Sequence, residues 1–205
     1  MTELETLNAE ISEFYEKYEG AELKTPEVLN AYIADTEEII ARYSNAEGDV
    51  KNRAAHFLNT TASMTIVFGN DLERGVPLYH RSLALAPDND DLYWGYYTTL
   101  EEIVDNDKLR TPALVNDAVM CLEFVINAIL SGKRPPDYLD GRYVDLGRVY
   151  MAAGDYPKAK ECFEKSLAVK PNDAAKKWLK TVNGKLGNPF TRFFKKLFSF
   201  FHGKD

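Results

Sequence analysis

The sequence has few of the residues that hold small secreted or metal-binding domains together. Its 205 residues include only two cysteines and three histidines. Cys121 and Cys162 each lie in a helix-like pattern, without a second cysteine or a histidine at metal-ligand spacing. We therefore expect two small buried thiols in a reducing compartment, and neither a metal ion nor another cofactor.

Sequence signatures of common enzymes are also missing. The chain has no glycine-rich phosphate loop, no HExxH pair and no GxSxG turn, and its three histidines do not cluster. The acidic neighbours Glu37-Glu38 and Glu101-Glu102 would not face each other on a helix, so we interpret both pairs as solvated. The sequence therefore predicts a protein that is not an enzyme and has no catalytic residues.

Glycine and proline are too scarce for a low-complexity chain. There are 12 glycines and 9 prolines, while 45% of the residues are hydrophobic and 28% are charged, as in folded water-soluble proteins. The first ten residues, MTELETLNAE, are acidic and lack the basic and apolar regions of a secretory signal. We expect a folded cytoplasmic protein.

Each end of the chain is poor in charge of one sign. The formal net charge is −7, but residues 1–50 carry 13 acids and 3 bases, a net of −10. Residues 174–205 carry 8 bases and 1 acid, a net of +7. The overall acidity argues against nucleic-acid binding. Two interpretations of these oppositely charged ends remain open. Both are solvated helix faces, or they attract each other, another copy of the chain or a charged partner.

Helical periodicity, by contrast, runs through most of the sequence, with no convincing run of alternating strand residues. Residues 1–50 carry two apolar stripes, separated by Gly20 and by the Thr-Pro pair at 25–26, which is typical of a helix start. They predict an acidic helical hairpin. A second Thr-Pro pair at 111–112 opens the apolar stretch ALVNDAVMCLEFVINAIL. Because this stretch is short and contains two acids, we expect a central buried helix rather than a membrane span.

Residues 140–173 read DGRYVDLGRVYMAAGDYPKAKECFEKSLAVKPND. They resemble a tetratricopeptide repeat (TPR) of about 34 residues, whose pattern is W-x2-L-G-x2-Y, then A-x3-F, then P. The residues at the pattern positions are Tyr143, Leu146, Gly147, Tyr150, Ala159, Phe163 and Pro171. Tyr143 stands where the family pattern has tryptophan. Gly147 and Ala159 are small enough for two helices to approach. Leu146, Tyr150 and Phe163 fill the seam between them.

A weaker copy of this repeat lies at residues 56–89. Gly75, Tyr79 and Pro87 keep the spacing of the second helix, whereas the first helix departs from the family pattern. Internal repetition of this kind is typical of stacked helix pairs.

The expected fold class is therefore all-α, with antiparallel helix-pair repeats stacked as a short TPR-like α-solenoid. The repeats occupy residues 51–173, with a lengthened repeat at 90–139 between the other two. Residues 174–187 have one apolar face and resemble the capping helix of such an array, and an amphipathic tail helix follows at 188–205.

The family resemblance implies that a protein or peptide binds along the concave face formed by the first helix of each pair. The corresponding positions in this chain are Trp94, Thr98, Glu101, Val144, Arg148 and Met151. Trp94 lies largely off the apolar stripe of its helix, so we expect either a binding role or burial under the loop at 107–111. One TPR subclass grips chaperone tails with a clamp of lysine and asparagine. That clamp is not present, because its positions hold Thr60, Met64, Val144 and Arg148.

Residues 188–205 contain six of the eleven phenylalanines of the chain. After the breaker sequence GNP, apolar and basic residues recur with helical spacing, and the candidate contact residues are Phe190, Arg192, Phe193, Phe194, Lys195, Lys196, Leu197, Phe198 and Phe201. The sequence leaves open three surfaces on which such a basic amphipathic helix can pack. They are the helical array itself, an anionic membrane surface, and a partner protein or second copy of the chain. The expected partner is a protein or peptide, with a membrane surface and a homo-oligomer as alternatives and without nucleic acid.

Overall fold

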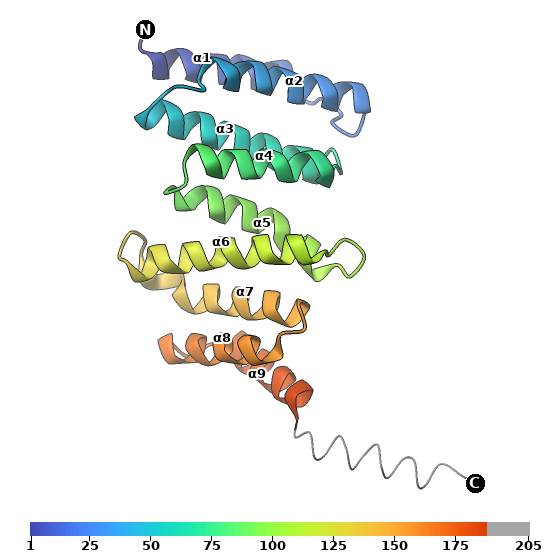
Figure 1. The fold of residues 1–205 in the computed structure, drawn as a ribbon, viewed down its shortest axis with the longest axis vertical. Coiled ribbons are helices and arrows are strands. Elements are labelled where there is room, and N and C mark those ends of the chain that lie inside the picture. The colour runs from blue at the N-terminus through green and yellow to red at the C-terminus, as the bar shows by residue number, and fades with distance from the viewer. Residues whose placement is uncertain (188–205) are drawn as a thin grey trace, which may run out of the picture. The chain divides into compact units, whose positions relative to one another are not determined.

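The computed structural model describes residues 1–187, and within them the chain forms nine α-helices and one short 3-10 helix, without strands (Figure 1). The predicted all-α class, with neighbouring helices packed in pairs as in a TPR-like solenoid, is confirmed. The chain divides into two compact units, Met1–Glu102 and the residues from Ile103 on. The domain boundaries expected from the sequence stay a prediction.

The first unit contains the N-terminal hairpin and the pair of helices with the weaker repeat pattern. Its helices are α1 (Glu3–Lys17), α2 (Pro26–Arg42), α3 (Gly48–Val67), α4 (Leu72–Leu85) and α5 (Asp90–Asp105), the last of which ends in the second unit. Both helices of the hairpin pack on α3, and α3 packs along α4.

Local signals set the ends of the hairpin helices. A reciprocal capping box starts α1, because the Glu5 amide donates to Thr2 Oγ1 at 3.2 Å while the Thr2 amide donates to Glu5 Oε2 at 2.7 Å. Pro26 is the first residue of α2, as predicted, although the side chain of the N-cap residue Thr25 makes no capping hydrogen bond. Gly20, in the loop between them, has a φ of +71°, which glycine adopts without strain.

Buried aromatic rings join the hairpin to α3. The ring centroid of Phe14 lies 4.9 Å from that of Phe57 and 4.8 Å from that of Tyr32. Phe57 and Tyr32 are fully buried, and the buried hydroxyls of Thr36 and Thr61 lie 3.2 Å apart. This mixed apolar and hydrogen-bonded contact fixes α2 against α3.

The second unit contains the best repeat and the helix after it. Its elements are α6 (Pro112–Leu130), η1 (Pro136–Tyr138), α7 (Leu139–Ala152), α8 (Tyr156–Val169) and α9 (Asp173–Leu186). Each α-helix in this series packs on the next, and α9 also contacts α7 (Figure 1). The helix expected to cap the array therefore covers the α7–α8 pair.

Helix α6 is 19 residues long and, by length and composition alone, apolar enough to cross a membrane. Half of its most apolar window is buried within the protein, and the helix packs along α7. Its fully buried residues include Ala118, Cys121 and Leu122. Burial raises the pKa of the Cys121 thiol well above its ordinary value and that of the Cys162 thiol to about 11. Both cysteines are free and buried, as predicted.

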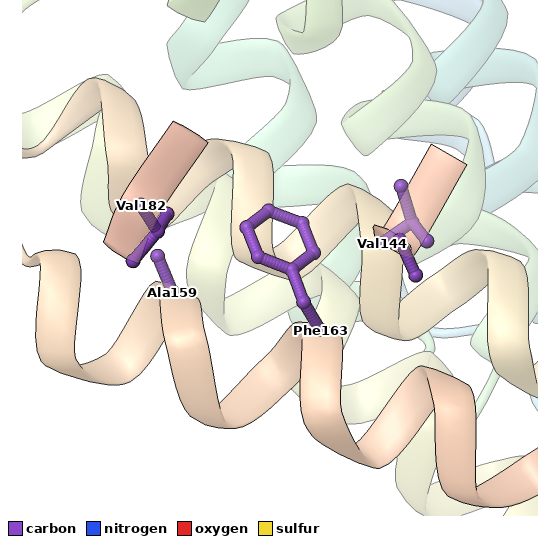
Figure 2. Close-up of a cluster of buried hydrophobic side chains, with 5 residues drawn as sticks. Val144, Ala159, Phe163 and Val182 are labelled. Atoms are coloured by element: carbon purple, nitrogen blue, oxygen red, sulfur yellow. The ribbon is translucent and has the colours of Figure 1, made fainter. Parts of the chain in front are cut away.

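The core of the α7–α8–α9 group is a small apolar cluster, whose buried members are Val144, Ala159, Phe163, Ala175 and Val182. Figure 2 shows the ring of Phe163 in the middle of this cluster, between Val144 and Val182. Gly147 lies against the same ring. A Cβ atom added there would be 2.5 Å from Cε1 of Phe163, so only glycine allows this approach.

A buried carboxylate connects the start of α7 to the turn before α9. Asp140 is 6% exposed, accepts a hydrogen bond from Asn172 Nδ2 at 2.7 Å and lies 3.0 Å from Lys170 Nζ. Burial alone would raise the pKa of Asp140, but these donors outweigh it and hold the pKa below its ordinary value. Asn172 also caps α9 by accepting from the Ala175 amide at 3.1 Å.

Candidate binding surface

The predicted groove residues of the first unit lie on α5. Trp94 is partly exposed and its ring centroid is 5.4 Å from that of Tyr97. Thr98 is exposed and its hydroxyl donates to the Gly95 carbonyl at 2.8 Å, while Glu101 is partly buried. The stripe expected to face the core is indeed buried, namely Leu92, Tyr93, Tyr96, Tyr97, Leu100, Ile103 and Val104. The structure therefore places Trp94 off the buried stripe.

Hydrogen bonds behind this surface hold α5 in place. Asn59 Nδ2 on α3 donates to the Leu92 carbonyl at 3.2 Å, and a Cβ atom added at Gly95 would be 2.7 Å from Asn59 Oδ1. On α4, the buried Tyr79 hydroxyl lies 2.6 Å from Thr99 Oγ1, and its ring stacks on Tyr96 with centroids 4.2 Å apart. These contacts fix the rotation of α5 and hence the direction in which Trp94 and Thr98 point.

The predicted groove residues of the second unit lie on α7 and differ in accessibility. Arg148 is partly exposed and forms an ion pair with Asp105. Met151 is partly buried and packs against the apolar cluster around Phe163. Val144 is only 7% exposed and belongs to that cluster, so it offers a ligand little surface. Arg148 and Met151 are therefore the residues of this set that a ligand can reach.

Sequence reasoning did not find the Arg148–Asp105 pair. The two residues are 43 positions apart, and no local motif connects them. The pair neutralises Arg148, with 26% of the arginine side chain and 49% of the aspartate side chain exposed to solvent. The pair therefore lies partly at the surface, where ion pairs are typically worth about 0 to 1 kcal/mol. The sequence-predicted residues at 190–201 lie outside the described part of the chain.

Sequence reasoning also missed a cavity in the first unit. It is lined by Tyr15, Tyr18, Gly20, Ala21, Glu22, Leu23, Lys24, Tyr32, Met64 and Phe68, and has a volume of about 530 Å³. We call it the aromatic pocket. Met64 is one of the positions at which the clamp of the chaperone-binding subclass would stand. Within residues 1–187, no cluster of three or more His, Cys, Asp or Glu side chains is placed to hold a metal ion.

Comparison with known families agrees with the helix-pair geometry. Residues 142–173 match the family model of the tetratricopeptide repeat, within the 140–173 segment that the sequence singled out. The chain therefore contains a tetratricopeptide repeat, and the predicted resemblance is confirmed for the α7–α8 pair. No curated protein matches the chain.

Proposed function

We propose that the protein is a non-catalytic scaffold that binds a peptide or protein segment along the first helices of its repeats. The observation that carries this proposal is the tetratricopeptide repeat at 142–173, since repeats of this family generally bind proteins or peptides. Its packing supports the proposal, because the α7–α8 pair is fixed by Gly147 and Phe163 and thus presents α7 as a rigid surface.

Two surfaces are the candidates for ligand contact. In the first unit, α5 presents the partly exposed ring of Trp94 beside the exposed hydroxyl of Thr98. In the second unit, α7 presents Arg148 with Met151 nearby in sequence. Tryptophan and arginine are the residue types most enriched among the side chains that dominate binding energy. An apolar side chain on α5 and an acidic group at Arg148 are the ligand features that match these surfaces.

Replacing Trp94 or Arg148 with alanine is expected to weaken binding of the main cellular partner by about tenfold or more for each change, as for a dominant interface residue. The measurement is affinity purification with the full-length protein, followed by titration of the recovered partner. Tyr138→Ala and Lys158→Ala serve as matched controls, because these exposed residues lie outside the two surfaces. Equal binding by all four variants would refute the assignment of both surfaces.

A second candidate function is a peripheral membrane adaptor attached through residues 188–205. The pattern of phenylalanines and bases in that segment supports it, because aromatic rings and cations are both favourable at an anionic interface.

The membrane candidate predicts that the full-length protein sediments with vesicles containing anionic lipid. Deleting residues 189–205 is expected to abolish sedimentation, and added salt is expected to weaken it, because exposed charges are screened over about 8–10 Å at physiological ionic strength. Neutral vesicles are the control. Absence of lipid binding, together with a fall in solubility on deletion, would rule out the membrane role.

A further inference from the structure

The aromatic pocket lies where the end of α1, the loop after it, α2 and α3 meet within the first unit. Its volume of about 530 Å³ falls in the range of ligand sites, roughly 300 to 1,000 Å³. Tyr15 comes from α1, Tyr18 directly follows α1, Tyr32 comes from α2 and Met64 comes from α3. Phe68 follows directly after α3.

Two of the aromatic rings that line the pocket pack on each other. The centroid of Tyr18 lies 5.0 Å from that of Tyr32 and 5.0 Å from that of Phe14. Phe68 is 51% exposed and Tyr15 is 40% exposed, which is unusual for side chains of this size in a packed helical protein. The Tyr32 hydroxyl is buried. An apolar wall with exposed aromatic side chains is typical of a site that receives another apolar group.

The pocket lies in the acidic part of the sequence. Glu22 lines it, and two exposed acids precede its loop in the sequence, Glu16 near the end of α1 and Glu19 in the turn after α1. Lys24 is the one base among the lining residues. The lining residues themselves balance one acid against one base, but residues 1–50 as a whole have a net charge of −10. This part of the chain therefore favours a ligand that combines apolar side chains with bases.

We propose that the aromatic pocket binds phenylalanine side chains of residues 188–201 from a second copy of this chain. That segment contains six phenylalanines with Arg192, Lys195 and Lys196 between them, so it combines the apolar and basic features that the pocket and its surroundings favour. Phenylalanine packs favourably on tyrosine rings and on the methionine sulfur, and the bases face the acidic surroundings. Exchange of such segments between identical chains produces a symmetric dimer when each copy supplies both pocket and segment.

The first test measures the oligomeric state of the full-length protein by sedimentation at several protein and salt concentrations. We expect the average mass to rise with concentration and to fall with added salt. Phe68→Lys places a charge in the pocket wall and is expected to weaken self-association about tenfold or more. Val67→Lys is the matched control, because Val67 is the adjacent residue, is 57% exposed and does not line the pocket. Circular dichroism of both variants checks that the helices are intact.

The second test uses a labelled synthetic peptide with the sequence of residues 188–201, titrated with the full-length protein. We expect saturable binding that Phe68→Lys weakens and Val67→Lys leaves unchanged. A peptide with every phenylalanine replaced by alanine keeps its charge and is expected not to bind. Equal binding of the peptide by the two variants, or a protein that stays monomeric at every concentration, would overturn the proposal. Binding of the peptide to anionic vesicles but not to the protein would overturn it in favour of a lipid anchor.

Discussion

Replacing Gly147 with leucine is expected to lower the free energy of unfolding of the second unit by about 1 to 3 kcal/mol or more, the effect of overpacking a dense core. A Cβ atom alone at this position would lie 2.5 Å from Cε1 and 2.8 Å from Cζ of Phe163. The ring cannot move aside easily, because it is fully buried and contacts α7, α8 and α9 residues on its other sides. The added side chain must therefore separate α7 from α8 or force strained rotamers.

The measurement is denaturant unfolding of the full-length protein, with Gly141→Ala as the matched control. Gly141 also lies in α7, but apart from its chain neighbours and the backbone of its own helix no atom is within 4 Å of the position of an added Cβ. Alanine is favoured over glycine in helices by up to about 1 kcal/mol, so this control is expected to be neutral or stabilising. If Gly147→Leu and Gly141→Ala unfolded at the same denaturant concentration, the close approach of α7 and α8 would be disproved.

Replacing Phe163 with alanine is expected to destabilise the same unit by about 3 to 5 kcal/mol, because it leaves a cavity at the centre of the apolar cluster. Phe163 is 0% exposed, and the cluster has no other aromatic residue among its buried members. Loss of the ring removes contacts with Val144 on one side and Val182 on the other (Figure 2). The unfolding midpoint reports the change, provided that the slope of the transition is unchanged.

The two substitutions are expected to compensate each other when combined. Gly147→Leu adds volume at the place from which Phe163→Ala removes it, so the double variant is expected to be more stable than the sum of the two losses predicts. A double-mutant cycle gives this coupling directly. Strictly additive losses would mean that the two positions act on separate parts of the core.

The sequence was most informative where the family pattern specifies packing inside one helix pair. Gly147 was predicted to allow the two helices to approach and Phe163 to fill the seam between them, and in the structure Gly147 lies against the Phe163 ring. Both residues lie within one repeat, and the resemblance to the family pattern implies their places at the seam. The pattern could not assign the rotation of α7 as finely, and Val144, expected on the groove, lies in the core with 7% exposure.

Contacts between distant parts of the sequence were not predictable. The aromatic pocket combines Tyr15, Tyr32 and Phe68 from three separate segments, each of which reads as an ordinary apolar position of its own helix or helix end. The ion pair of Arg148 with Asp105 likewise joins residues 43 positions apart. Periodicity shows which face of a helix is apolar, but it does not show which residues at the edge of that face remain uncovered.

The α3–α4 and α7–α8 pairs differ in which helix supplies the glycine at a close contact. In the α3–α4 pair, Gly75 belongs to the second helix and packs against Ile66 of the first, whereas in the α7–α8 pair the first helix supplies Gly147 against Phe163. The second helix of each pair keeps a small residue at the matching position, Gly75 and Ala159. Only the matching position of the first helix differs, with Ser63 in α3 and Gly147 in α7. A search that scores the combined side-chain volume of facing positions would rank both pairs alike, whereas a residue-by-residue pattern favours the pair that keeps glycine in the first helix.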